Sequence, residues 1–227
     1  MKKLTLVLLG LWVAMIFAGT VDSGPQSMNH AFKINSKSLS GMDLSFQVPE
    51  FEITTETVGN KTYQRLNLPG AGSLMQSGMP ELPTVSANIA IPARGSVSIV
   101  ATGATERVIN QYLAYPLQQG AELDSPKGFV LNAQYYSEGA LYPEAAIEYS
   151  DPQILRDFRI VTVQINPFSY NAQTGELIVR ETVNFRINYN SSPGINELVS
   201  EPTQISSAFA KLYEGVILNF ADYRSFL

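Results

Sequence analysis

A stretch near the C-terminal end of the chain alternates between apolar and polar residues. From Leu177 to Tyr189 every second position is apolar, except that Glu181 occupies one of these positions. A period of two over this length is typical of a half-buried β-strand, whereas the apolar positions of a helix recur every three or four residues. The segment therefore requires a sheet with one buried face.

The sequence before this strand predicts a partner for it. Phe158–Ile165 is apolar and β-branched, and the connection from Asn166 to Gly175 is rich in turn-forming residues. We therefore expect a long antiparallel hairpin over residues 156–189. Shorter strands, separated by glycine and proline, are expected at residues 43–48, 51–57, 62–68, 85–91, 97–101 and 106–114.

Many short strands punctuated by turns predict an all-β fold, an antiparallel β-sandwich or a jelly-roll-like domain. We assign residues 41–205 to this sandwich. A C-terminal helix is expected over residues 206–223, where apolar residues recur at helical spacing and Ser206 could cap the start. Residues 69–82 and 115–144 are predicted to be long irregular loops, which often carry function.

The N-terminus has the three-part pattern of a secretory signal peptide. Lys2 and Lys3 precede an apolar run from Leu4 to Phe17, and Ala18 supplies a small residue for cleavage. A run of this length is shorter than the roughly 20 residues that a membrane-spanning helix needs, which argues against the alternative of a membrane anchor. We expect a signal peptide at residues 1–18, a flexible segment at residues 19–40, and a secreted protein without a membrane attachment.

Composition excludes most catalytic chemistry. The chain has no cysteine and one histidine, His30, so disulfides, a cysteine nucleophile and cysteine-based zinc sites are excluded. The formal net charge of −5 argues against a nucleic-acid partner. No phosphate-binding loop or metal motif is present, so we expect no cofactor, no metal and no catalytic residues.

Three motifs occur in a fixed order in the sandwich region. The first is G-x-P-x-L-P at Gly78–Pro83, the second is R-D-x-R at Arg156–Arg159, and the third is P-F-x-Y-N followed by T-G-x-L, at Pro167–Leu177. In this order, and after a signal peptide, they resemble the N-terminal propeptide of gingipain-type cysteine peptidases of the clostripain-like clan. The resemblance covers roughly residues 40–225.

This resemblance implies a β-sandwich prodomain that docks on a gingipain-type catalytic domain, assists its folding and holds it latent. It implies an inhibitory basic residue, for which Lys127 is the first candidate and Arg94 the second. Residues 206–227 would then form the junction to a catalytic domain that this sequence lacks, with Arg224 as a processing position. Within the second motif, the charged residues are expected to form a surface ion-pair cluster.

Two other functions remain open on the sequence alone. The chain could be a secreted adhesion or carbohydrate-binding module, with a stacking platform formed by Tyr135, Tyr136, Tyr142 and Tyr149. It could also be a hydrolase, for which His30 is the only catalytic candidate.

Overall fold

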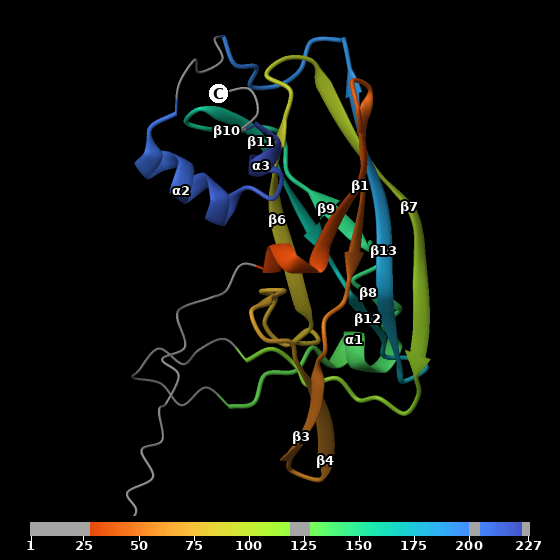
Figure 1. Cartoon of the computed structure of the whole chain (residues 1–227). Helices are drawn as coiled ribbons and strands as arrows, with labels where there is room; N and C mark the ends of the chain where they lie inside the picture. Colours follow the sequence, from red (N-terminus) through yellow and green to blue (C-terminus); the bar gives the residue numbers. More distant parts are fainter. Residues whose placement is uncertain (1–27, 119–127, 200–204, 224–227) are drawn as a thin grey trace, which may run out of the picture.

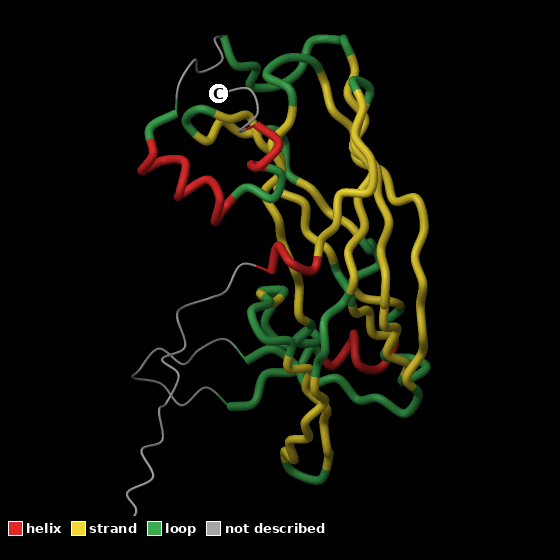
Figure 2. The backbone as a smooth tube through the Cα atoms, viewed as in Figure 1, coloured by secondary structure: helices red, strands yellow, loops and turns green. Residues whose placement is uncertain are grey.

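The computed structural model describes residues 28–118, 128–199 and 205–223. Its strands form two antiparallel sheets that face each other, with a separate two-stranded hairpin at one end and the C-terminal helices near the other (Figures 1 and 2). The predicted all-β sandwich with a C-terminal helix is therefore confirmed.

The first sheet is built around β13, the strand that the alternating pattern predicted. One edge of β13 pairs along nearly its whole length with β7, and the other edge pairs first with β12 and then with β2. The strands of this sheet are β1 (Phe32–Ser38), β2 (Gly41–Gln47), β7 (Ser96–Ile109), β8 (Leu141–Tyr142), β12 (Phe168–Asn171) and β13 (Glu176–Asn190). At Glu181 the register between β13 and β7 shifts, and the carboxylate reaches the surface, where it pairs with Arg107 at 2.9 Å.

The second sheet is built around β6 and β11, which pair from Val85 opposite Ile165 to Ile91 opposite Arg159. The free edge of β11 is covered in succession by β10 and β9, and β5 pairs with the start of β6. The strands are β5 (Gly72–Ser73), β6 (Pro83–Ile91), β9 (Ile147–Tyr149), β10 (Gln153–Leu155) and β11 (Phe158–Ile165).

Most of the remaining elements lie toward the two ends of the sandwich, whereas the short N-terminal helix lies beside its middle (Figure 1). The separate hairpin consists of β3 (Glu52–Val58) and β4 (Lys61–Asn67). The described helices are η1 (Met28–Ala31), α1 (Ala133–Glu138), α2 (Ser207–Val216) and α3 (Phe220–Tyr223). Helix α1 was not expected, because its residues fall in the segment predicted to be irregular; Asn132 begins it by accepting a hydrogen bond from the Tyr135 amide.

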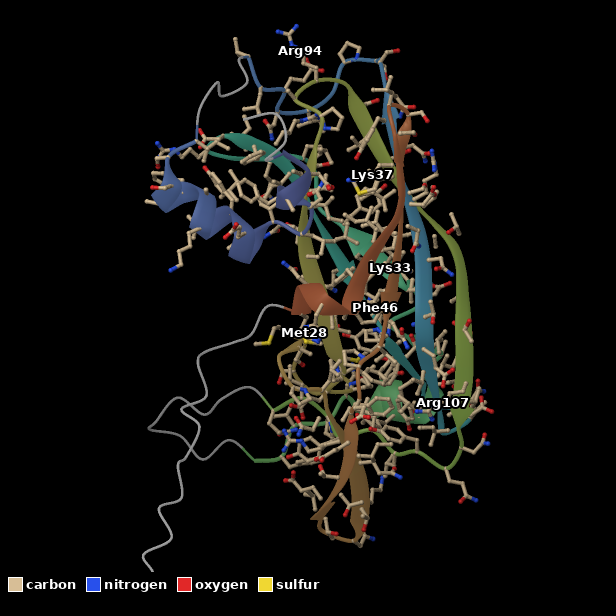
Figure 3. All side chains as sticks on the ribbon, in the orientation of Figure 1. Met28, Lys33, Lys37, Phe46, Arg94 and Arg107 are labelled. Atoms are coloured by element: carbon tan, nitrogen blue, oxygen red, sulfur yellow. The ribbon has the colours of Figure 1, made fainter. Side chains whose placement is uncertain are left out.

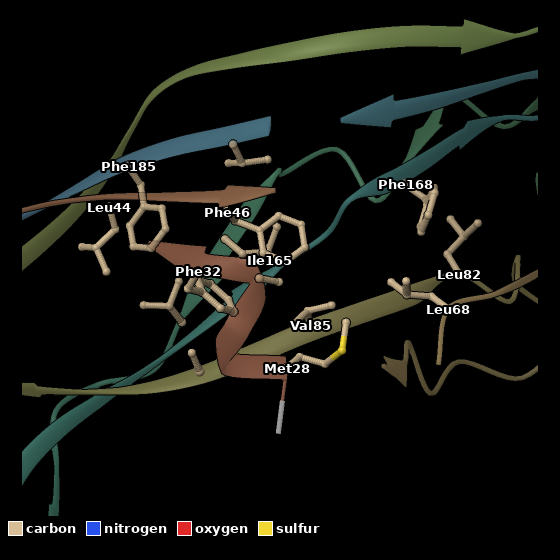
Figure 4. Close-up of a cluster of buried hydrophobic side chains, with 14 of the residues drawn as sticks. Met28, Phe32, Leu44, Phe46, Leu68, Leu82, Val85, Ile165, Phe168 and Phe185 are labelled. Atoms are coloured by element: carbon tan, nitrogen blue, oxygen red, sulfur yellow. The ribbon is translucent and has the colours of Figure 1, made fainter. Parts of the chain in front are cut away.

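The core lies between the two sheets and consists of aromatic and aliphatic side chains from both (Figure 4). Phe46, Phe168 and Phe185 of the first sheet are fully buried and face Val85 and Ile165 of the second. Each such side chain contributes on the order of 1.5–3 kcal/mol when it leaves water. Burial on this scale is consistent with a chain that folds without disulfides.

The predicted hairpin over residues 156–189 is wrong in one respect. β11 and β13 do not pair, because the chain crosses from the second sheet to the first at Asn166 and Pro167. Proline has no amide hydrogen and cannot continue the strand ladder. The actual hairpin is formed by β12 and β13, and it closes at Asn171 and Glu176.

The flexible segment predicted for residues 19–40 is also corrected where it is described. Residues from Met28 onward form η1 and β1, and β1 pairs with β2. Phe32 is buried with its ring centroid 5.1 Å from that of Phe46, so this segment contributes to the core. Residues 19–27 and the signal peptide predicted for residues 1–18 lie outside the described part.

The C-terminal helix is interrupted between α2 and α3. Residues from Ile217 to Asn219 approach the free edge of β6, where Leu218 donates its amide hydrogen to the Asn88 carbonyl. The Asn219 side chain accepts from the amide of Ala90 at 2.8 Å and donates to its carbonyl at 2.9 Å, as a neighbouring strand would. Sheet pairing therefore replaces the middle of the predicted helix, and Ser206 makes no side-chain cap.

Candidate functional site

Of the candidate cleavage, inhibitory and processing residues from the sequence, the structure describes only Arg94. Ala18, Lys127 and Arg224 lie outside the described residues. Arg94 is exposed on the turn between β6 and β7, at the end of the molecule opposite the β3–β4 hairpin (Figure 3). One of its guanidinium nitrogens is 3.5 Å from the Val199 carbonyl oxygen.

The turn that carries Arg94 is held from beneath by Arg159, which is 1% exposed. The Arg159 guanidinium donates to the carbonyl of Pro92 at 3.1 Å, to that of Gly95 at 2.8 Å and to that of Ile195 at 2.6 Å. The ion-pair cluster predicted for the second motif is therefore corrected: Arg156 pairs with Asp157, whereas Arg159 points into the protein. Arg159 has a structural role, and burial lowers its pKa from the ordinary arginine value.

Glu197 holds the same turn through backbone amide groups. Its Oε1 accepts hydrogen bonds from the amides of Gly95 at 2.8 Å and Gly194 at 2.9 Å, and these bonds hold the pKa of the carboxyl below its ordinary value. Because the pKa is lowered on folding, the stabilisation is present above the unfolded-state pKa and is lost as the pH falls through the folded-state pKa.

Replacing Glu197 with glutamine should therefore reduce the acid sensitivity of the fold. The amide oxygen can still accept a hydrogen bond, but the charge that titrates is gone. We expect the unfolding midpoint to fall less between about pH 7 and about pH 3 in Glu197→Gln than in the wild type. The exposed Glu138 provides the control variant Glu138→Gln, and an equal pH dependence in wild type and Glu197→Gln would contradict the prediction.

At the opposite end of the sandwich, the glycine–proline loop holds the segment that precedes Lys127. The two segments predicted as separate irregular loops pair with each other there: the Gly78 amide donates to the Leu117 carbonyl, the Leu117 amide to the Met79 carbonyl, and the Glu81 amide to the Tyr115 carbonyl. We call residues 115–118 and 128–132 the two stems, because they flank residues 119–127. The first sequence motif thus forms a support for the stem that precedes Lys127.

An aromatic cluster joins both stems to the β3–β4 hairpin. Phe129, in the second stem, lies 5.4 Å from Tyr63 of β4 and 5.8 Å from Tyr115 of the first stem, measured between ring centroids. Arg65 lies over the Tyr115 ring at 4.6 Å and pairs with Glu81 at 2.9 Å. The hairpin, the glycine–proline loop and both stems therefore form one packed unit.

The tyrosines expected to form a stacking platform have other roles. Tyr135 donates its hydroxyl to the Tyr170 carbonyl at 2.7 Å, Tyr136 donates to the Ala114 carbonyl at 2.8 Å, and both rings pack against the core. Burial raises the pKa of both hydroxyls above the ordinary tyrosine value. Tyr142 packs against Tyr135, whereas Tyr149 is half exposed on the second sheet, so the four rings present no common face.

The described residues form no group that could hold a metal ion. His30 is exposed in η1. No group of three or more histidine, aspartate or glutamate side chains within residues 28–118, 128–199 and 205–223 is placed to hold a metal ion. In the same part of the chain, no helix has the length and hydrophobicity that crossing a membrane requires.

The sequence matches the family described as Propeptide_C25 over residues 27–227. Lys-gingipain of Porphyromonas gingivalis is 26% identical over 165 residues, which are 69% of this chain and 10% of the relative. Gingipain R2 of the same organism is 22% identical over 213 residues, which are 92% of this chain and 28% of the relative. The chain therefore spans only a minor part of the length of these curated relatives.

Two solved structures have the same fold. A chain in the complex of Porphyromonas gingivalis RgpB pro- and mature domains superposes with a TM-score of 0.72 at 20% identity, covering 85% of this chain and 97% of that one. A chain from a structure on the zymogenic latency of gingipain K superposes with a TM-score of 0.59 at 24% identity, covering 75% and 96%. The resemblance inferred from the three motifs is confirmed: this chain belongs to the Propeptide_C25 family and is homologous to the propeptide regions of gingipains.

Proposed function

We propose that this chain is the secreted prodomain of a gingipain-type cysteine endopeptidase, which assists the folding of the catalytic domain and keeps it latent. The observation that carries the proposal is the fold shared with the chain from the RgpB pro- and mature-domain complex, which this chain covers almost completely. The partner is accordingly a gingipain-type catalytic domain. The chain itself supplies no catalytic group and needs no cofactor.

The inhibitory segment in this proposal is residues 119–127. It lies between two stems that are supported by the glycine–proline loop and the β3–β4 hairpin. Lys127 is the only basic residue from Gln118 to Val130, so it is the candidate for the specificity pocket of an enzyme that cleaves after basic residues. Arg94 is the weaker candidate, because it lies at the other end of the sandwich (Figure 3).

The same proposal gives a role to each end of the chain. Residues 1–18 serve as the signal peptide, with cleavage near Ala18, and export places the protein outside the inner membrane. Residues 206–227 form the junction to the catalytic domain, and Arg224 is the processing position.

Inhibition and binding measured together test the proposal. The full chain, after signal removal, is titrated against a gingipain-type catalytic domain from the same organism, with residual peptidase activity and complex formation as readouts. We expect a stable one-to-one complex and saturable loss of activity. Refolding the denatured catalytic domain with and without the chain tests the folding role separately. Absence of both binding and inhibition would overturn the proposal, and glycan binding instead would favour the adhesion alternative.

A further inference from the structure

Two residues outside the hydrophobic core tie the stems to each other and to the glycine–proline loop. They are Gly78, in the first sequence motif, and Gln118, the last described residue before residues 119–127. We call this pair the collar. Both stems leave the sandwich at the end that carries the β3–β4 hairpin (Figure 2).

Gln118 connects the two stems through its side-chain amide. Its Nε2 donates to the Val130 carbonyl at 2.9 Å, and its Oε1 accepts from the Val130 amide at 2.8 Å. The same Nε2 also donates to the Pro116 carbonyl at 2.9 Å. The carboxamide thus satisfies both backbone groups of Val130, as a paired strand would, and fixes the distance between the stems.

Gly78 occupies the space between the stems. Its amide donates to the Leu117 carbonyl at 2.9 Å, and its own carbonyl accepts from the Asn132 amide at 3.0 Å. Its φ is +77°, and a Cβ atom there would lie 3.0 Å from the Asn132 nitrogen and 3.3 Å from the Leu131 carbonyl carbon. Only glycine combines this conformation with so close an approach, which explains why the first position of the motif is a glycine.

We propose that the collar, Gly78 and Gln118, is a positioning device that fixes the spacing of the stems, so that the segment between them acts as an inhibitor of the peptidase rather than as its substrate. The proposal rests on the proposed function. A substrate-like segment whose ends are held binds with a smaller entropic cost. If it is cut, held ends also keep the new termini together in the active site. Loosening the ends removes both effects.

Gln118→Ala is the primary test, because it removes the tie between the stems without touching the hydrophobic core. Gln134→Ala, at an exposed glutamine of α1, is the matched control. Gly78→Ala tests the second half of the collar, and Gln118→Glu keeps the size of the side chain but removes the donor to Val130. Each variant is prepared as the full chain after signal removal, and its unfolding midpoint is recorded.

Three quantities are measured: the inhibition constant for the catalytic domain, the rate of cleavage after Lys127 by that domain, and the rate of cleavage after Lys127 by trypsin. For Gln118→Ala and Gly78→Ala we expect inhibition weakened by about tenfold or more and both cleavages accelerated by a similar factor. Gln118→Glu should fall between wild type and Gln118→Ala, and Gln134→Ala should match the wild type.

The outcomes separate the two proposals. A wild-type chain that neither binds nor inhibits the catalytic domain overturns the proposed function, and the positioning role falls with it. A wild-type chain that inhibits, while Gln118→Ala inhibits equally well and is cut no faster, overturns the collar alone. Faster cleavage of Gln118→Ala with an unchanged unfolding midpoint supports the positioning role, whereas a loss of inhibition that only follows a lowered midpoint contradicts it.

Discussion

Arg159→Met is expected to lower the free energy of unfolding by about 3–5 kcal/mol, because three backbone carbonyl groups lose the buried side chain that donates hydrogen bonds to them. The side chain is 1% exposed, and its guanidinium donates hydrogen bonds to the carbonyls of Pro92, Gly95 and Ile195. Methionine fills much of the same volume but donates no hydrogen bond. Urea-induced unfolding followed by far-UV circular dichroism measures the change.

An exposed arginine of the same protein provides the control. Arg107 is 45% exposed and pairs with Glu181 at 2.9 Å, so Arg107→Met is expected to cost at most about 1 kcal/mol. If both methionine variants lost the same small amount of stability, the hydrogen bonds of Arg159 would contribute no more to the free energy of unfolding than a surface ion pair. A change in the urea m-value would instead indicate a different denatured state.

Replacing Lys127 is expected to have the largest effect on the proposed inhibition. If its ammonium group enters a pocket built for a basic side chain, Lys127→Ala leaves the charge of that pocket unpaired, which costs about 2–5 kcal/mol. That corresponds to a loss of affinity of roughly 30-fold or more for the catalytic domain. The inhibition constant of the full chain, determined at constant ionic strength, measures it.

Two variants make this result interpretable. Lys61→Ala, at the turn of the β3–β4 hairpin, removes the same charge elsewhere and should leave inhibition unchanged. Arg94→Ala, at the opposite end of the sandwich, tests the second candidate directly. Wild-type inhibition by Lys127→Ala combined with loss of inhibition in Arg94→Ala would transfer the inhibitory role to Arg94.

Periodicity predicted the longer strands β2, β3, β4, β6, β7, β11 and β13, apart from β1, but not their partners. The alternation around Phe185 identified β13 because one face of that strand is buried and the other is polar. The same reasoning paired β11 with β13, since adjacent strands usually form hairpins. The chain instead changes sheets at Pro167, and no local pattern distinguishes a turn within one sheet from a crossing between two. Short strands such as β8 and β9 carry too few residues for any period to be visible.

The candidate site was predicted only in part, for a similar reason. The G-x-P-x-L-P motif contains Gly78 and supported the family resemblance, but the positive φ that requires glycine there became visible only in the structure. Gln118 carried no signal, because a glutamine that bonds to the backbone of Val130 looks the same in sequence as one that faces water. Arg159 was assigned to the surface because arginine is rarely buried, and its partners are carbonyl groups that any sequence supplies.

The position of β13 has a consequence for how the molecule is assembled. This strand lies between β2 and β7, with Val183 opposite both Phe46 and Ala104, so the centre of the first sheet comes from a late part of the chain. Contacts between residues so distant in sequence make folding slow. Until β13 is available, the inner edge of β2 is unpaired and can pair with other chains. Truncation before β13 should therefore yield an aggregating polypeptide rather than a smaller folded unit.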